Sequence, residues 1–368
     1  MRIGILGGGQ LGRMIALAGI PLDIRCVFLD PDPDAPAAAV GELITGAFDD
    51  PAALDRLASS CDVFTFEFEN VPSGAIEYLM RRGKTVHPSS KALTTAQDRR
   101  LEKAAFTRLG IPTPRHASIQ SPADVSAAIR TVGLPAVIKT CHGGYDGKGQ
   151  QVVRTEAEAH TAIAALGGRP LIAEELIAFD RELSIIAVRS TVGDHAAYPL
   201  VHNRHAGGIL RETQAPAPDI SEAIQREAET YANRLLDDLG YVGVMALEMF
   251  DVGGRLLANE IAPRVHNSGH WTIEGSHTSQ FENHLRAILG WPLGSTAMRG
   301  GSIMFNLIGG VPSREQMLAC EGAHVHLYGK QPRSGRKVGH VTVCGDTVEE
   351  ALQRAAPLRE LIDRATRT

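Results

Sequence analysis

The stretch GGYDGKGQ at Gly143–Gln150 decides how the middle of this chain is interpreted. It is preceded by the apolar run Ala136–Ile138 and Lys139, and it is followed by Val152–Val153. This pattern predicts two short strands joined by a glycine-rich loop. Backbone N–H groups exposed by glycine, together with lysine charges, suit the phosphates of a nucleotide. The spacing is not that of a P-loop, so a glycine-rich hairpin without a ligand remains the alternative.

Length and composition describe an ordinary globular protein. The chain has 368 residues, of which 43% are hydrophobic and 21% are charged, so we expect two or three domains. A formal net charge of -5 argues against a protein that binds nucleic acid through bulk positive charge. The five cysteines lie far apart without a CxxC pair, which favours free thiols in a reducing cytoplasm. No apolar run reaches membrane-spanning length, so we predict no membrane anchor.

The first ninety or so residues alternate between strand and helix patterns. Strands are expected at Arg2–Leu6, Arg25–Leu29 and Val63–Phe68, and helices at Gly12–Ala18 and Pro51–Ser59. This alternation predicts a parallel sheet covered by helices. The first strand runs into a G-x-G-x-x-G loop at Gly7–Gly12, and Asp30 ends the second strand. Such a loop serves dinucleotides, with the acid on a ribose, but equally any phosphate at a helix N-terminus.

Turn signals divide the rest of the chain. We expect an N-terminal Rossmann-like domain at 1–92, a central domain at 93–292 with a glycine-loop subdomain at about 115–182, and a small C-terminal α/β domain at 293–368. Long helices are expected at Lys91–Leu109 and Ser221–Leu239. Val242–Phe250 and Arg255–Ile261 predict two strands joined by a tight turn at Gly253–Gly254.

Two acidic residues fall opposite one another on that hairpin. Counting back from the turn places Glu248 and Glu260 roughly opposite one another, and the side-chain period of two allows both to face the same side of the sheet. Like charges in this arrangement repel each other, so a shared proton, a lysine or a metal cation must offset them. Carboxylates, with the amide oxygen of Asn259, suit an Mg²⁺ ion that also binds nucleotide phosphates. The alternative is a pair of solvated glutamates on an edge strand.

Two further segments are rich in polar groups. Directly after the hairpin, residues 264–270 form the string RVHNSGH, a dense set of donors that suits an oxyanion or a small carboxylate. A polar surface loop is the alternative there. Earlier in the chain, the apolar run Leu171–Ala173 leads into Glu174 and Glu175, and Glu182 follows a short loop. An extended segment of this kind can offer backbone groups to an adenine and a carboxylate to a ribose.

These motifs occur in the order and spacing of the ATP-grasp ligases, and the chain resembles the N5-carboxyaminoimidazole ribonucleotide synthetases within that superfamily. Four strings carry the resemblance: GGGQLGRM at 7–14, GGYDGKGQ at 143–150, EIAPRVHNSGHWT at 260–272 and GRKVGH at 335–340. Together they span nearly the whole chain and are far more specific than the first glycine loop alone. The resemblance implies an α/β ATP-grasp fold and an ATP-dependent ligase of purine biosynthesis.

The resemblance also implies a reaction and its partners. Bicarbonate would attack the γ-phosphate of ATP to give carboxyphosphate. The amine of 5-aminoimidazole ribonucleotide would then be carboxylated, with release of ADP and phosphate. The family further implies Mg²⁺, with Mn²⁺ as an alternative, a cytoplasmic homodimer, and no nucleic-acid or membrane partner.

Matched position by position, the family implies four groups of site residues. ATP would contact Arg99, Lys139, Gly144, Tyr145, Asp146, Gly147, Lys148, Gly149, Gln150, Glu174, Glu175, Leu176, Ile177, Glu182, His205, Asn259 and Glu260. Mg²⁺ would bind Glu248 and Glu260. Bicarbonate and carboxyphosphate would lie against Arg264, His266, Asn267 and Ser268. The ribonucleotide would meet Gln10, Leu11, Tyr145, Lys330 and Arg336, with Glu67 or Glu69 facing its amine.

Other classes of protein fit less of the chain. A formate-dependent ribonucleotide transformylase or a biotin carboxylase shares the ATP-grasp pattern, but the GRKVGH string and the chain length disfavour both. A nicotinamide-dependent dehydrogenase would use the Gly7–Gly12 loop and Asp30, and it would leave the central region unexplained. A non-catalytic nucleotide-binding regulator would lack the paired carboxylates. We expect instead that the amides of the loop meet the phosphoribosyl end of the ribonucleotide and that Asp30 is structural.

Overall fold

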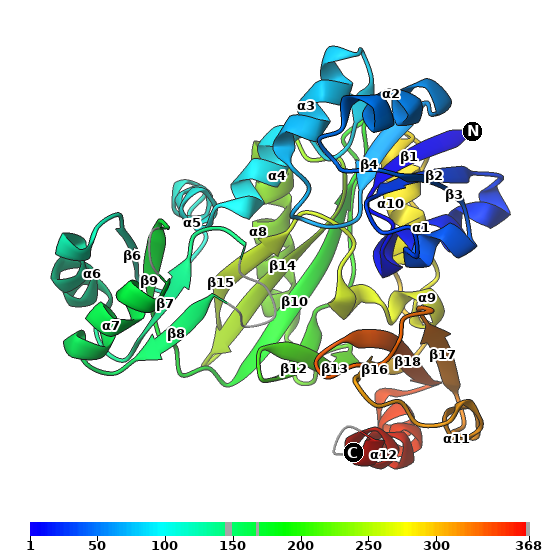
Figure 1. Cartoon of the computed structure of the whole chain (residues 1–368). Coiled ribbons are helices and arrows are strands. Elements are labelled where there is room, and N and C mark those ends of the chain that lie inside the picture. Colours follow the sequence, from blue (N-terminus) through cyan, green and yellow to red (C-terminus); the bar gives the residue numbers. More distant parts are fainter. Residues whose placement is uncertain (144–148, 167–168, 366–368) are drawn as a thin grey trace.

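Three β-sheets form the frame of the chain in the computed structural model, which describes residues 1–143, 149–166 and 169–365 (Figure 1). Their strand orders are β3-β2-β1-β4-β5, β6-β9-β7-β8, and β15-β14-β10-β12-β13-β16-β18-β17 with β11 beside β10. The mixed α/β fold with an N-terminal parallel sheet is therefore confirmed. In the part of the chain that the structure describes, no helix is both long enough and apolar enough to cross a membrane.

The N-terminal sheet is parallel. Its strands are β1 (Arg2–Leu6), β2 (Arg25–Asp30), β3 (Glu42–Thr45), β4 (Val63–Phe66) and β5 (Thr85–Val86), and its helices are α1 (Gln10–Gly19), α2 (Pro51–Ser60) and α3 (Ser73–Arg81). The strands read as continuous apolar runs because helices cover them. Since β1 and β4 are neighbours, the loops that follow them lie side by side at one edge of the sheet.

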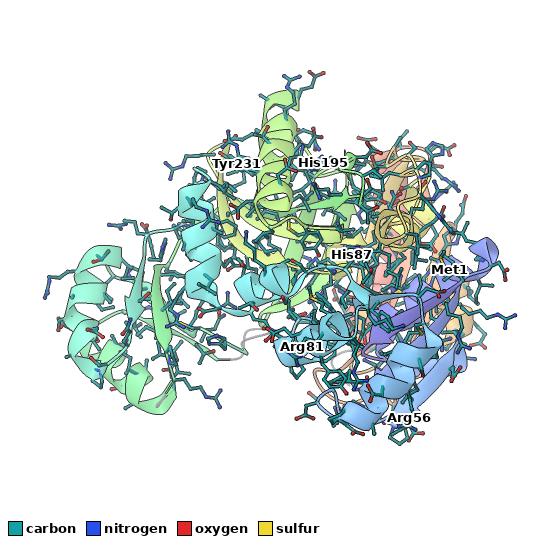
Figure 2. The ribbon with its side chains drawn as sticks, turned by 90° about the horizontal axis from the view of Figure 1, so that it is seen from above. Met1, Arg56, Arg81, His87, His195 and Tyr231 are labelled. Carbon is teal, nitrogen blue, oxygen red and sulfur yellow. The ribbon has the colours of Figure 1, made fainter. Side chains whose placement is uncertain are left out.

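A small lobe carries the second sheet and stands away from the rest of the molecule (Figures 1 and 2). It holds β6 (His116–Ile119), β7 (Ala136–Thr140), β8 (Gln150–Val153), β9 (Leu171–Glu175), α6 (Val125–Val132) and α7 (Glu156–Leu166). The predicted strand pair around the glycine loop is confirmed, because β7 and β8 are antiparallel neighbours. The lobe has an apolar core of its own between its sheet and its two helices.

The large sheet runs through the middle of the chain to its C-terminal part. Its strands are β10 (Arg181–Arg189), β11 (His195–Ala197), β12 (Val201–Ala206), β13 (Ile209–Ala215), β14 (Gly243–Val252), β15 (Arg255–Ala262), β16 (Gly301–Ile308), β17 (Ala323–Leu327) and β18 (Lys337–Gly345). The C-terminal segment does not form a sheet apart, because β16 pairs directly with β13. Lys330, in the connection between β17 and β18, donates a hydrogen bond to Gln10 of the N-terminal domain.

The remaining elements connect and cover these sheets. They are α4 (Ser90–Gln97), α5 (Arg99–Arg108), α8 (Glu222–Asp238), α9 (Thr272–Gly275), α10 (Gln280–Ile288), α11 (Arg314–Leu318), α12 (Val348–Ala365) and the 3-10 turns η1 (Ile20–Leu22), η2 (Pro36–Ala39), η3 (Pro122–Asp124) and η4 (Asn267–Gly269). Helix α10 joins the N-terminal sheet to the large sheet, since it packs against both α1 and β14.

The single helix expected at Lys91–Leu109 is wrong, because the structure has α4 and α5 in its place. Asp98 between them has an extended backbone, and its side chain accepts a hydrogen bond from the N–H of Arg100. Aspartate in this role is a strong N-cap, so a new helix starts there. The break turns α5 toward β15.

The hairpin of β14 and β15 confirms the predicted tight turn and the predicted opposition of its two glutamates. Gly253 and Gly254 both have positive φ values, of 60° and 81°, as the tight turn requires. Glu248 is the direct partner of Glu260. One step nearer the turn, Met249 pairs with Ala258, so Asn259 is the extra residue of a β-bulge.

Candidate functional site

Polar residues from the N-terminal sheet, the large sheet and the C-terminal segment line one pocket of about 470 Å³. Its described lining includes Gly9, Gln10, Leu11, Glu67, Glu69, Arg99, Glu102, His205, Glu248, Glu260, Arg264, His266, Asn267, His270, Lys330 and Lys337. The pocket thus brings together twelve of the predicted site residues, several of them far apart in sequence.

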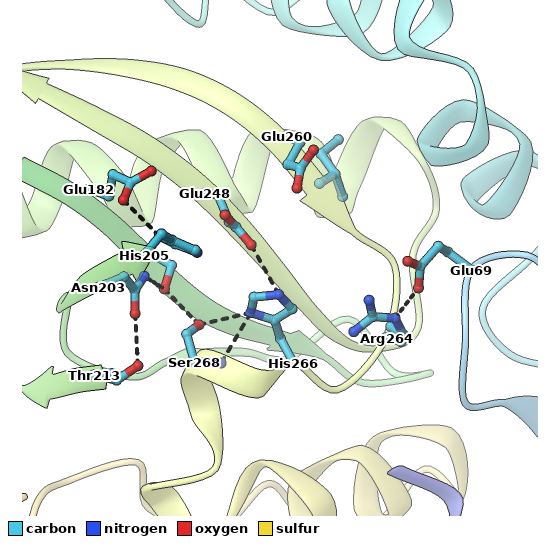
Figure 3. A network of polar contacts seen from close by, with 12 residues as sticks. Glu69, Glu182, Asn203, His205, Thr213, Glu248, Glu260, Arg264, His266 and Ser268 are labelled. Carbon is cyan, nitrogen blue, oxygen red and sulfur yellow. Dashed lines mark hydrogen bonds and ion pairs between the residues drawn. The ribbon is translucent and has the colours of Figure 1, made fainter. Parts of the chain in front are cut away.

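The two carboxylates of the β14–β15 hairpin share one face of the sheet and are held by different side chains. Arg99 Nη1 lies 3.0 Å from Glu260. His266 Nε2 lies 3.0 Å from Glu248 (Figure 3). Burial opposes ionisation of Glu248, yet its contact with His266 lowers its pKa to about 2. An arginine and an imidazole therefore offset the repulsion that the register creates.

The oxygen atoms around this pair fit a hard divalent cation. Asn259, the extra residue of the bulge, directly precedes Glu260. The buried Oδ1 of Asn259 has no hydrogen-bond partner among the described residues. Two carboxylates and a neutral amide oxygen suit Mg²⁺, which usually takes its remaining ligands from phosphates and water. Within the described residues, no cluster of three or more acidic, histidine or cysteine side chains could hold a metal alone. The donor set thus fits a metal that arrives with a nucleotide.

A buried chain of hydrogen bonds ends at His266 (Figure 3). Thr213 Oγ1 donates to Asn203 (2.9 Å), and Asn203 Nδ2 donates to Ser184 Oγ (2.8 Å). Ser184 donates to Ser268 Oγ (2.7 Å), which lies 2.8 Å from His266 Nδ1. The chain lies on one face of the large sheet and on η4, so the sheet holds the imidazole ring in place. Asn267, between these residues, has a buried side-chain amide without a partner among the described residues.

Arg264 is bound by a carboxylate from the N-terminal domain. Its Nε donates to Glu69, in the loop after β4. Burial opposes ionisation of Glu69, but the Arg264 guanidinium lowers its pKa to about 2. The Arg264 side chain is only 15% exposed. This contact closes the pocket on the side of the N-terminal domain.

The glycine loop after β1 is filled by the protein itself. The N–H groups of Gly9, Leu11 and Gly12 donate to Glu67 at 3.0, 3.1 and 3.2 Å. The expectation that these amides meet the phosphoribosyl end of a substrate is therefore wrong for this structure. Glu67 takes the place of a phosphate at the N-terminus of α1, which also contradicts a dinucleotide site there.

Asp30 is structural, as expected. Its carboxylate accepts hydrogen bonds from the N–H groups of Gly8 (2.7 Å) and Asp32 (2.9 Å). Gln10 extends from the same glycine loop and accepts a hydrogen bond from Lys330. Arg336 is not among the described residues that line the pocket, and its guanidinium lies 3.5 Å from the carbonyl of Gln331. The next residue, Lys337, does line the pocket.

The expected adenine and ribose residues lie along β9 and β10. Lys139 donates a hydrogen bond to Glu174 at 2.7 Å. Burial of Glu174 opposes its ionisation, but the charges of Lys103 and Lys139 outweigh this effect and lower its pKa to about 2. Glu182 binds His205 Nδ1 at 2.7 Å, and Glu175 pairs with Arg115. Leu176 and Ile177 follow β9. Gly149 and Gln150 lead into β8, whereas Gly144, Tyr145, Asp146, Gly147 and Lys148 lie outside the described residues.

Sequence reasoning missed several residues beside the predicted ones. Glu102 and Lys103 are almost fully buried next to β15, and Ser184 and Asn203 are buried behind His266. Nothing in the sequence distinguishes them from ordinary polar residues of helices and strands. The one available signal was their spacing from Arg99, because Glu102 and Lys103 stand at i+3 and i+4 on a helix.

Family models match almost the whole length of the chain. Residues 1–97 match a ribonucleotide synthetase preATP-grasp domain, and residues 104–281 match the ATP-grasp domain. Residues 302–354 match the phosphoribosylaminoimidazole carboxylase C-terminal domain.

Relatives and solved structures agree with these matches. The N5-carboxyaminoimidazole ribonucleotide synthase of Pseudomonas aeruginosa is 52% identical over 94% of this chain and 95% of its own length. The crystal structure of the synthetase from Thermus thermophilus is 56% identical, with a TM-score of 0.94 over 98% of both chains. The Aspergillus clavatus enzyme, solved with ADP and 5-aminoimidazole ribonucleotide, is 35% identical, with a TM-score of 0.91 over 99% of this chain and 98% of that chain. The chain therefore belongs to the N5-carboxyaminoimidazole ribonucleotide synthase family of ATP-grasp enzymes.

Proposed function

We propose that this chain catalyses the ATP- and bicarbonate-dependent carboxylation of 5-aminoimidazole ribonucleotide. The product is N5-carboxyaminoimidazole ribonucleotide, formed on the way to purines, with ADP and phosphate released. The observation that carries the proposal is the shared pocket. In this pocket the paired carboxylates of β14 and β15 face the Arg264–Ser268 loop. Gln10, near the N-terminus, and Lys330, in the C-terminal segment, line the same pocket and are hydrogen-bonded to each other.

The nucleotide would lie between the small lobe and the large sheet. Glu174, Glu175, Leu176 and Ile177 would receive the adenine, and Glu182 with His205 would hold the ribose. Lys139 and Arg99 would meet phosphate oxygens, in place of the glutamates that they bind in this structure. Phosphoryl transfer asks the protein mainly for positioning and charge neutralisation, and this set supplies both. The glycine loop up to Gln150 would cover the phosphates and limit the access of water.

Glu248 and Glu260, together with Asn259, would hold Mg²⁺, or Mn²⁺ in its place, and the metal would neutralise phosphate charge. His266 would be freed for another partner once Glu248 binds a cation, because it now donates to that carboxylate.

The loop after β15 would hold the small anions. This loop offers four kinds of polar group within a short stretch of sequence: the guanidinium of Arg264, the imidazole of His266, the amide of Asn267 and the hydroxyl of Ser268. A bicarbonate oxygen would attack the γ-phosphorus of ATP and ADP would leave, which gives carboxyphosphate. The amine nitrogen of the ribonucleotide would then attack the carboxyl carbon, with loss of phosphate. Charge-assisted donors that are fixed before the reaction stabilise both steps.

The ribonucleotide would enter from the side of the N-terminal loop. Gln10, Leu11 and Lys330 are already together there, and Tyr145 and Arg336 complete the expected set. Glu67 or Glu69 would face the reacting amine. A homodimer in a reducing cytoplasm belongs to the same proposal, and the five free cysteines agree with such a compartment.

The deciding experiment measures ADP release from ATP with and without 5-aminoimidazole ribonucleotide, and with bicarbonate depleted. We expect fast ADP release only when both co-substrates are present. Carbon-13 bicarbonate would label the carbamate carbon of the product, which NMR can follow before it decays. ADP release that does not depend on the ribonucleotide would contradict the proposed substrate, and release without bicarbonate would contradict the carboxyphosphate route.

A further inference from the structure

Helix α5 lies along the edge strand β15 and presents three charged residues to it. Arg99, Glu102 and Lys103 stand at i, i+3 and i+4, so their side chains share one face of the helix. Glu102 and Lys103 are 1% and 0% exposed. Charged residues are almost never buried to this degree unless they are paired, so each must have a partner.

The partners are the peptide groups on either side of Glu260. Glu102 Oε1 accepts a 2.5 Å hydrogen bond from the N–H of Ile261, which follows Glu260. Lys103 Nζ donates a 2.7 Å hydrogen bond to the carbonyl of Asn259, which precedes it. Arg99 binds the Glu260 carboxylate itself. One helix turn thus holds both the side chain and the flanking backbone of a single residue.

An ordinary edge strand does not need this arrangement. Its outer N–H and C=O groups can meet water or a neighbouring loop, as when Ala258 donates to the carbonyl of Pro112. Buried charges cost desolvation energy, and buried ion pairs contribute little net stability. The pair at 102–103 stands opposite the bulge, where the regular pairing of β15 with β14 is interrupted. Its placement is therefore better explained by what it positions than by stability.

We propose that Glu102 and Lys103 are positioning residues that fix the direction of the Glu260 carboxylate toward the pocket. The inference rests on the proposed function, in which Glu260 binds the metal of the nucleotide. Lys103 Nζ also lies 3.6 Å from Glu174, on β9 of the small lobe. The same ammonium group therefore links the strand that carries Glu260 to the strand expected to meet adenine.

Substitutions at both positions separate this role from simple packing. Glu102→Met removes the acceptor for Ile261, and Lys103→Met removes the donor to Asn259, while both keep an unbranched chain of similar length. Burial raises the pKa of Glu102 to about 8, so Glu102→Gln is a close match for its neutral form and keeps an acceptor. Arg108→Met is the control, because it removes an exposed ion pair with Asp238 from the other end of α5.

The readout is binding of Mn²⁺ to the enzyme–ADP complex, followed by electron paramagnetic resonance. We expect both Met variants to weaken Mn²⁺ binding about tenfold, because groups that orient metal ligands typically account for 10- to 100-fold in affinity. Binding of metal-free ADP, measured by calorimetry, should weaken less than binding of Mn²⁺, because the two peptide groups held by Glu102 and Lys103 flank the metal ligand Glu260. The tenfold loss of Mn²⁺ affinity corresponds to ~1.4 kcal/mol. Glu102→Gln should stay within about threefold of the wild type, and Arg108→Met should match it.

Three results would overturn the proposal. The first is Mn²⁺ binding by both Met variants that is as tight as in Arg108→Met. The second is a loss in Glu102→Gln equal to that in Glu102→Met, and the third is an equal loss of metal-free ADP. Should Glu102→Met fail to fold, Lys103→Met carries the same expectation. Failure of the proposed function would give a different result. The wild-type protein would then release ADP at a rate that does not depend on the ribonucleotide, while Mn²⁺ binding would still be weakened in the Met variants.

Discussion

The β14–β15 hairpin and the loop after β1 both bring polar groups to the pocket, but they satisfy them in opposite ways. On the hairpin, Glu260 and Glu248 are held by the side chains of Arg99 and His266. In the loop, three backbone N–H groups converge on the buried carboxylate of Glu67.

The difference decides which region is free to bind a ligand. Side-chain ion pairs at the border of a pocket exchange partners at small cost, because they are partly exposed and long side chains can turn. Glu260 is 39% exposed and can take a new partner in this way. Backbone amides cannot turn, and removing a buried carboxylate from them leaves unsatisfied donors. The hairpin is therefore suited to a ligand, whereas the loop is part of the scaffold around it.

Removal of a hairpin carboxylate should have the largest effect. Glu260→Ala deletes half of the proposed metal pair, and we expect ADP release to fall at least about 1,000-fold, since charge neutralisation by a metal contributes several kcal/mol. The fold should persist, because the carboxylate is partly exposed and bound only by Arg99 among the described ion pairs. ADP release and the thermal midpoint Tm test this together. Near-normal turnover in a folded variant would rule out the metal assignment.

Removal of the loop carboxylate should lower the stability of the fold. Glu67→Ala leaves the N–H groups of Gly9, Leu11 and Gly12 without their acceptor, which should cost about 1–3 kcal/mol in the free energy of unfolding. Glu67→Gln keeps one acceptor oxygen, and it should lose clearly less than the Ala variant. Chemical denaturation of the two variants against the wild type measures the difference. Equal stability of Glu67→Ala and the wild type would show that the loop does not depend on this carboxylate.

The basic segment near the C-terminus offers a third comparison. Lys330→Ala should raise the KM for 5-aminoimidazole ribonucleotide at least about tenfold, because Lys330 lines the pocket beside Gln10 and one charged contact contributes on the order of 1.5–3 kcal/mol. Arg336→Ala should have a smaller effect, since Arg336 contacts Gln331 at the surface. Both should leave the KM for ATP unchanged. A larger effect at Arg336 would mean that this segment changes its position when the ribonucleotide binds.

Local patterns in the sequence predicted the hairpin, its tight turn and the strand–helix alternation correctly. The turn at Gly253–Gly254 brings Glu248 to within one residue of the position opposite Glu260, and the bulge at Asn259 then makes the two glutamates direct partners. The site also followed from strings that lie close together in sequence, such as residues 264–270.

Contacts between distant segments were not predictable in the same way. Glu67 fills the Gly7–Gly12 loop from the segment directly after β4, more than fifty residues later, so the loop looks open in sequence. The β-bulge at Asn259 changes which side chains can meet, and no residue there signals it. Glu102 and Lys103 resemble an exposed helix pair until Asp98 ends the preceding helix and turns α5 onto β15.

The last prediction concerns the pH dependence of stability at Glu102. Burial, the largest influence, raises the pKa of Glu102 from 4.5 to about 8. The charges of Lys103 and Arg99 oppose this rise, and the charge of Glu260 adds to it. Between these values the folded chain holds one proton more than the unfolded chain, so the stability contributed by this group is complete below about pH 4.5 and is lost as the pH rises toward 8. Glu102→Gln cannot release this proton. Relative to the wild type, it should therefore gain stability with increasing pH, by at most on the order of 1.4 kcal/mol per pH unit. Denaturation of both proteins at pH 5.5, 6.5 and 7.5, as ~1-unit steps across this window, tests the sign, because other groups cancel in the difference. A difference that stays constant across the window would show that Glu102 is ionised in the folded protein, and that its contact with Ile261 is made by a carboxylate.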